Sequence, residues 1–311
     1  MTIFLNKVKK NYILIGLLVI FILVICKSKL VITTVIEASS IYFNNVFPCM
    51  FIFYTLGDLL ISYNIYKAFN TTFGKILSKI FNLSSNGLLL VFLSMLLGFP
   101  SGSKYICYFL DKDYIDYNLA NKLLYVTHFS NPIFILGTIS ILTNMKIALI
   151  VLISHYGSNI LLILMIKNKF TNINTKYSSN SKELIEVLNE SFINTFKIIL
   201  IVLFNTIIFI TLSTLINSLY KNKIFNLIIF MIFDITNGII SITNINLSLF
   251  IKGLLITILL TFGGINIHFQ VKSIIKNKKL PYSSFFKGRF IATLLSIIIY
   301  ILLFNVLKVR L

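Results

Sequence analysis

Long apolar runs separated by short polar stretches make up most of this chain. The longest runs lie at residues 11–30, 48–65, 146–166, 197–219 and 290–307. A helix that spans a membrane needs about 20 apolar residues, so the pattern predicts about eight to ten hydrophobic segments when shorter, interrupted runs are included. The predicted fold class is therefore an all-α polytopic membrane protein.

Composition agrees with this interpretation. Of the 311 residues, 57% are hydrophobic and only 12% are charged, which leaves too few polar side chains to cover a soluble globule. The first apolar run follows three lysines within residues 7–10 and resembles a signal peptide, but no small-residue cleavage site follows it. We therefore expect residues 1–30 to form an uncleaved N-terminal transmembrane helix, and the chain to be an integral membrane protein in contact with the lipid bilayer.

The net charge of +19 does not indicate a nucleic-acid-binding protein, because the basic residues are spread over nearly every loop. One group of them is expected to mark a cytoplasmic loop: Lys276, Lys278, Lys279, Lys287 and Arg289. Cys26, Cys49 and Cys107 lie far apart without metal-ligand spacing, and we expect them to be small buried side chains. Because no catalytic triad order, zinc spacing or phosphate-binding loop is present, the sequence predicts no enzyme, metal or cofactor.

The most informative polar stretch interrupts an apolar run at residues 98–104, Gly-Phe-Pro-Ser-Gly-Ser-Lys. Proline lacks a backbone amide and glycine gives up backbone order, so this stretch predicts a broken helix. Unpaired backbone is costly in hydrocarbon, and a break at membrane depth is tolerated only where protein or a water-filled cavity satisfies it. Lys104 places a cation beside the break, which is how transporters build a midplane site for an anion.

Interruptions of the same kind occur at three later positions. Residues 130–132, Ser-Asn-Pro, predict a helix junction with proline in the first turn and either preceding side chain as its cap. This junction is equally compatible with a structural cap and with a contact to substrate. Residues 234–238, Asp-Ile-Thr-Asn-Gly, and residues 263–266, Gly-Gly-Ile-Asn, predict two further breaks. The predicted helix breakers are Gly98, Pro100, Pro132, Gly238 and Gly263.

The interruptions divide the chain into two related halves. In each half an apolar run holds an aspartate, Asp58 or Asp234, and a following apolar helix ends at a glycine break, at Gly98 or Gly263. Matched interrupted segments point to a transporter site where the broken or re-entrant helices meet, near the membrane midplane. The predicted organisation is an N-terminal helix at 1–30, a first repeat at 31–166, a polar linker loop at 167–183 and a second repeat at 184–311.

Several polar residues beside the breaks are candidates for the site. Asp58 and Asp234 are carboxylates inside apolar segments, where such groups are costly and functional by default, so each is expected to bind a coupling ion or to act as a structural counter-ion of Lys104. Asp234 is the stronger candidate, because Thr236 and Asn237 supply further polar groups. The predicted substrate-binding residues are Ser101, Gly102, Ser103, Lys104, Ser130, Asn131, Asn237, Gly264, Asn266, His268 and Gln270.

These blocks, in this order, resemble the YlbJ (SpoVV) family of sporulation integral membrane proteins, whose members carry a gate or nucleoside-recognition type domain. The resemblance runs from residue 47 to about residue 289. Its most specific parts are residues 98–104, 127–137, 234–238 and 263–270. It implies a protein that moves dipicolinic acid across the outer forespore membrane during sporulation.

The predicted function is therefore a membrane transporter of a small anionic metabolite, with dipicolinate as the substrate that the resemblance implies. Dipicolinate has two carboxylates on a rigid ring, so Lys104 would bind one and the second glycine break, with Asn266, His268 and Gln270, would bind the other. Two alternatives remain open. The first is a transporter of a nucleoside or another small metabolite, and the second is a membrane scaffold for spore maturation that transports nothing.

Overall fold

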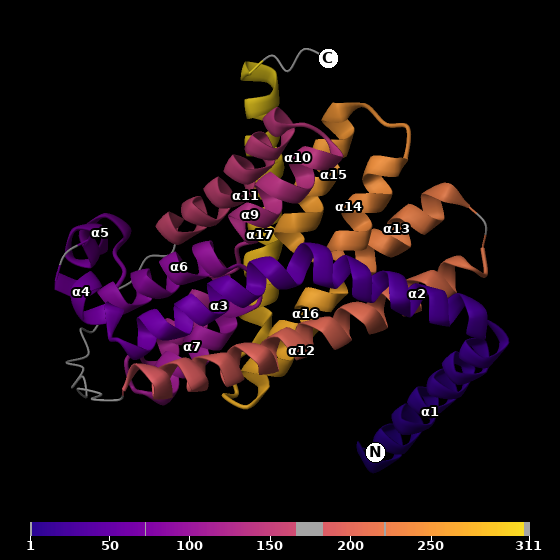
Figure 1. Cartoon of the computed structure of the whole chain (residues 1–311), viewed down its shortest axis with the longest axis horizontal. Coiled ribbons are helices and arrows are strands. Elements are labelled where there is room, and N and C mark those ends of the chain that lie inside the picture. Colours follow the sequence, from indigo (N-terminus) through magenta and orange to yellow (C-terminus); the bar gives the residue numbers. More distant parts are fainter. Residues whose placement is uncertain (1, 72, 166–182, 221, 308–311) are drawn as a thin grey trace.

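The computed structural model describes residues 2–71, 73–165, 183–220 and 222–307, and the chain is all-helical over these ranges (Figure 1). Within them, four helices are long and apolar enough to cross a membrane, and the number rises to six if each of two bent helix pairs is one span. The predicted all-α polytopic fold with broken helices is thus confirmed. Except for Glu183, the linker predicted at 167–183 lies outside the described residues.

The N-terminal segment is bent and does not form one helix through residue 30. Helix α1 (Thr2–Cys26) meets helix α2 (Ser28–Ile41) at Lys27, and the bend between residues 11–26 and 28–46 is 94°. Figure 1 shows α1 projecting away from the other helices. Cys26 is consequently exposed, in contrast to the burial expected from its apolar surroundings in the sequence.

A long helix and two short ones follow. The π-helical turn η1 (Tyr42–Val46) joins α2 to α3 (Phe47–Ser62) without a gap, so Pro48 does not begin a separate span. The wider π turn makes room for the proline ring, which would clash with the carbonyl of Asn44 in a regular α-helix. The two helices that follow α3 are short, α4 (Ile65–Thr71) and α5 (Phe73–Phe81).

Each half of the chain then contains a helical hairpin and a broken helix. In the first half, α6 (Ser85–Leu97) and α7 (Ser101–Asp111) pack against each other. Residues 127–131 separate α8 (Tyr117–Val126) from the helical run α9 (Pro132–Phe134), η2 (Ile135–Ile139) and α10 (Ser140–Leu142). In the second half, α13 (Lys223–Phe233) and α14 (Ile235–Asn244) form the hairpin, and α15 (Leu249–Phe262) and α16 (Ile265–Lys276) form the broken helix.

In both halves, the tip of the hairpin touches the break of the broken helix. A Cβ atom added to Gly98 would lie 2.7 Å from the backbone nitrogen of Asn131, and one added to Gly264 would lie 3.1 Å from that of Asp234. The break at 98–100 therefore corresponds to Asp234, and the break at 127–131 corresponds to Gly263 and Gly264. The sequence suggests another pairing, of Gly98 with Gly263, because each glycine ends an apolar helix. In the structure both do have positive φ, 76° and 85°.

Two of the predicted features have different structural roles. Asp58 lies on the long helix α3 and is not the counterpart of Asp234, which lies at a hairpin tip. Gly238, a predicted helix breaker, lies inside α14. A Cβ atom there would come within 2.5 Å of Leu259 Cδ2, so this glycine allows α14 to pack closely against α15.

Long helices hold the two halves together. Helix α12 (Leu184–Asn217), from the second half, lies along α2 and α3 of the first half. Helix α17 (Tyr282–Val306) packs against α15 and also against α8 and α11 (Met145–Met165) of the first half. This interlocking brings the breaks of both halves into the interior.

Candidate functional site

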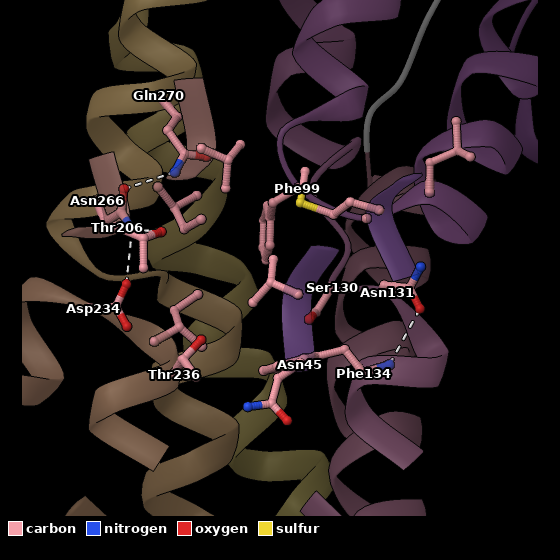
Figure 2. A pocket seen from close by; sticks show the side chains of 17 residues that line it. Asn45, Phe99, Ser130, Asn131, Phe134, Thr206, Asp234, Thr236, Asn266 and Gln270 are labelled. Atoms are coloured by element: carbon pink, nitrogen blue, oxygen red, sulfur yellow. Dashed lines mark hydrogen bonds between the residues drawn. The ribbon is translucent and has the colours of Figure 1, made fainter. Parts of the chain in front are cut away.

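The four helix breaks contribute to one small polar cavity of about 90 Å³ (Figure 2). Its lining from the first half includes Gly98, Phe99, Ser130 and Asn131, and its lining from the second half includes Asp234, Thr236, Asn266 and Gln270. Asn45 of η1 and Thr206 of α12 add polar side chains from the long helices. The cavity therefore lies where the two halves meet.

A chain of hydrogen bonds orients the polar groups of the second half (Figure 2). Asp234 Oδ1 accepts from the backbone N–H of Asn237 at 2.9 Å and so caps α14, while Asp234 Oδ2 accepts from Asn266 Nδ2 at 2.9 Å. Asn266 Nδ2 also donates to Thr206 Oγ1 at 3.2 Å, and its Oδ1 accepts from Gln270 Nε2 at 2.8 Å. Because an ionised carboxylate can only accept, it fixes the direction of both amides.

This direction leaves one acceptor unused. Gln270 Oε1 is buried and has no hydrogen-bond partner among the described residues. The second-half side of the cavity is thus lined by a carboxylate, that of Asp234, and by the side chain of Gln270. Among the described residues that line it, there is no lysine or arginine.

Asn131 acts as a helix cap, which was one of the two alternatives for this junction. Its Oδ1 accepts from the backbone N–H groups of Ile133 and Phe134 at 2.8 and 3.3 Å, and its Nδ2 donates to the carbonyl of Leu96 at 3.2 Å. Both polar ends of the side chain are therefore occupied. Asn131 fastens the broken helix to the hairpin, while neighbouring Ser130 also lines the cavity.

Lys104 does not line this cavity, in contrast to the prediction. Its Nζ lies 2.7 and 2.8 Å from the two carboxylate oxygens of Asp58, and Tyr105 donates its hydroxyl to Asp58 at 2.8 Å. The geometry therefore matches the counter-ion alternative, in which an ion pair joins α7 to α3. The reason is helical rotation, since Lys104 lies almost one turn beyond the hairpin tip.

The residues just before Lys104 are also displaced from the cavity. Ser101, Gly102 and Ser103 are buried in the first turn of α7, but none of them lines it. A Cβ atom on Gly102 would lie 1.9 Å from the carbonyl oxygen of Thr127. This turn therefore packs directly against the break of the neighbouring broken helix.

Helix periodicity also separates the candidates on α16. Asn266 and Gln270 lie four residues apart and face the cavity, whereas His268 faces a different, apolar groove. His268 is hydrogen-bonded there to Tyr282 Oη at 2.6 Å and to the carbonyl of Phe262 at 3.0 Å. Asn237 and Gly264 do not line the cavity, and they contribute through backbone contacts with Asp234.

Arg289, which the sequence places in a basic loop, is completely buried. Its guanidinium donates to the carbonyls of His128 at 2.9 Å, Thr261 at 3.3 Å and Tyr125 at 3.3 Å, and to Asn159 Oδ1 at 2.6 Å. The carbonyls of Tyr125 and Thr261 belong to the C-terminal ends of α8 and α15, where helix dipoles favour a cation, and that of His128 lies in the break after α8. Arg289 thus stabilises both broken helices through hydrogen bonds to backbone carbonyls next to their breaks.

Two α11 side chains satisfy more of the broken backbone. His155 Nε2 accepts from the N–H of Ser130 at 2.9 Å, and Tyr156 donates its hydroxyl to the carbonyls of Met95 and Ser130 at 2.6 and 3.0 Å. Sequence reasoning missed both, together with Arg289, Asn45 and Thr206. For Arg289, the available signal was a cation directly before an apolar run, whereas the others are single polar residues without a motif.

Comparisons with known proteins give one match. No protein-family model matches the chain, and no solved structure matches it. Over 292 residues, the chain is 20% identical to the sporulation integral membrane protein YlbJ of Bacillus subtilis (strain 168), and the match covers 80% of this chain and 72% of that protein. Together with the apolar spans, this similarity identifies the chain as an integral membrane protein and as a distant homologue of that sporulation protein.

Proposed function

We propose that the chain transports a small polar metabolite across a membrane during sporulation, with dipicolinate as the first candidate substrate. The observation that carries the proposal is the polar cavity at which hairpin tips and broken helices of both halves meet. Irregular backbone at membrane depth is tolerated where it is buried in protein or lines a cavity, and transporters use such breaks as binding sites. The sporulation role and the outer forespore membrane rest on the similarity to the relative.

The helix ends around the cavity provide for an anion. Helix α16 begins at a break, Asn266 and Ile267 of its first turn line the cavity, and its N-terminus has no side-chain cap in the described part of the chain. Such N-termini carry partial positive charge and free amides, which attract carboxylates. Arg289 covers the opposite, negative ends of α8 and α15, so these carbonyl ends do not repel an anion.

Asp234 is the proposed coupling group. As a carboxylate it would repel an anionic substrate, and through Asn266 it fixes the Gln270 amide so that Oε1 has no partner among the described residues. A proton on Asp234 removes the charge and lets the carboxyl group donate, so the amides of Asn266 and Gln270 can reverse. Gln270 would then present an N–H donor to the substrate, and proton and anion would move together.

The cavity is narrow in this conformation. Its volume of about 90 Å³ lies well below the roughly 300–1,000 Å³ of pockets that enclose a drug-sized ligand. Substrate entry therefore requires the hairpin tips to separate from the broken helices. The contacts of Gly98 with Asn131 and of Gly264 with Asp234 are the ones that would open.

One observation favours a second candidate, a transporter of a neutral nucleoside. The cavity is lined by Asp234 and the unpartnered Gln270 Oε1, with no basic side chain among the described lining residues. Acceptors of this kind suit the hydroxyl and N–H donors of a nucleoside. They suit dipicolinate only after Asp234 is protonated.

The test is uptake into proteoliposomes that contain the purified full chain. Wild-type protein should take up dipicolinate, and Asn266→Ala should lower the rate by about 10- to 100-fold, because a hydrogen bond to a charged group contributes about 1.5–3 kcal/mol. Asn277→Ala is the matched control, since Asn277 is exposed at the end of the same helix.

The outcomes separate the candidate functions. Uptake of a nucleoside that dipicolinate does not inhibit would support the second candidate. Normal dipicolinate content in spores of a deletion strain, with no uptake of either substrate by the purified protein, would contradict transport and favour a membrane scaffold.

A further inference from the structure

A second cavity, with a volume of about 890 Å³, lies on the outer side of the second half. Helices α13, α15, α16 and α17 form it, and almost all its lining side chains are apolar. It is separate from the polar cavity, since its residues on α16 lie on the opposite face from Asn266 and Gln270. Nothing in the proposed transport mechanism uses this groove.

The groove has the length of one membrane leaflet. Its wall on α17 is a single stripe at four-residue spacing, formed by Tyr282, Phe286, Phe290 and Leu294. From the first to the last, this stripe is about 18 Å long, at about 1.5 Å per helical residue. The hydrocarbon core of a bilayer is about 30 Å thick, so one leaflet is about 15 Å deep.

The two ends of the groove differ in polarity. At one end Lys272 is the single charged side chain among the described lining residues, and its Nζ lies 5.6 Å from the ring centre of Tyr282. The adjoining ends of α16 and α17 carry three more exposed cations, Lys276, Lys279 and Lys287. The other end, around Leu294, is apolar. Tyrosine and lysine at one end are typical of a membrane interface, where basic side chains attract anionic headgroups.

We propose that this groove binds an anionic phospholipid, with one acyl chain along the α17 stripe and the headgroup phosphate at Lys272. An apolar groove that opens on the outside of a membrane-embedded bundle cannot be filled by water at low cost. The length and the aromatic wall of the groove match an acyl chain, and its cationic end matches the headgroup phosphate. The lipid would contact α16 on the face opposite Asn266 and Gln270.

The experiment is native mass spectrometry of the purified full chain, released from nanodiscs of phosphatidylcholine that contain a titrated fraction of phosphatidylglycerol. Wild-type protein should retain phosphatidylglycerol in preference to phosphatidylcholine. Lys272→Gln should weaken this retention about fivefold, because one lysine near an anionic surface contributes about 1 kcal/mol. Leu294→Trp should fill the groove and reduce retention without changing the charge.

Matched controls test whether each effect belongs to the groove. Lys75→Gln removes an exposed lysine from α5, and Leu302→Trp adds the same bulk at an exposed position of α17 that does not line the groove. Neither should change lipid retention. Equal retention of the two lipids by wild-type protein, or unchanged retention in Leu294→Trp, would overturn the proposal. Efficient cross-linking of Phe290→Cys chains to each other in membranes would instead assign the groove to a second copy.

Discussion

At the scale of single residues, each buried charge of the interior is held by specific partners. Arg289 bonds three backbone carbonyls and Asn159, Lys104 bonds Asp58, and Asp234 bonds Asn266 and the N-terminus of α14. A charge without such partners would be too costly away from water. Of these four charged residues, only Asp234 lines the polar cavity.

The pairing of Lys104 with Asp58 leads to a prediction about stability. Lys104→Met should destabilise the purified protein, by less than the about 3–5 kcal/mol that fully buried pairs lose, because the Lys104 side chain is 19% exposed. Asp58→Asn combined with Lys104→Met should recover most of the loss, since neither charge is then unpaired. Thermal unfolding in detergent measures this cycle, and equal losses in the single and double variants would argue against the counter-ion role.

Asp234 leads to a prediction about pH. If uptake of an anion requires a protonated Asp234, the rate should fall as the pH rises through the titration of this group. Asp234→Asn is neutral at every pH, so its uptake should persist and lose most of its pH dependence. Initial rates of dipicolinate uptake at matched protein content provide the measurement. A variant whose pH profile follows that of the wild type would exclude Asp234 as the proton carrier.

At the scale of the elements, two kinds of interrupted helix have distinct uses. The hairpins α6–α7 and α13–α14 fold back on themselves, while α8–α9 and α15–α16 continue beyond their breaks. Residues 249–276 are together long and apolar enough to cross a membrane, although the glycine break interrupts them. Helix α11 supports the first-half breaks with His155 and Tyr156, so the backbone polar groups there are satisfied by side chains.

The close packing of α7 against the backbone of Thr127 can be tested by adding one methyl group. Gly102→Ala would place a Cβ atom 1.9 Å from the carbonyl oxygen of Thr127, so it should destabilise the protein by about 1–3 kcal/mol through overpacking. Gly137→Ala is the control, because nothing lies within 4 Å of its added methyl group. Thermal unfolding of both purified variants is the measurement. Similar melting temperatures for the two would contradict the close approach.

At the scale of the whole molecule, the helices of the two halves interlock. Helix α12 lies along α2 and α3 (Figure 1). Helix α17 packs on α8 and α11, and α7 touches α16. The cavity is lined from both halves, so neither half by itself contains the site. Any opening of the cavity must therefore change contacts between halves.

This interlocking predicts how the chain behaves when it is divided. A protease site inserted at residue 175, between the described parts of the two halves, should allow cleavage into fragments that stay together in detergent. The contacts of α12 with α2 and α3 should hold them. Each half expressed by itself should be degraded or aggregate. Size-exclusion chromatography after cleavage is the measurement, and separation into two folded fragments would show that the halves are independent.

The membrane class, the helix breaks around residues 100, 130 and 263, and the polar groups of Asp234, Asn266 and Gln270 can be predicted from the sequence. Apolar length and the backbone chemistry of glycine and proline are local properties, so they can be read from the chain. The correspondence of the breaks, the pairing of Lys104 with Asp58 away from the cavity, and the burial of Arg289 become visible in the folded chain. Those outcomes depend on helix rotation and on contacts between distant segments, which no local pattern specifies.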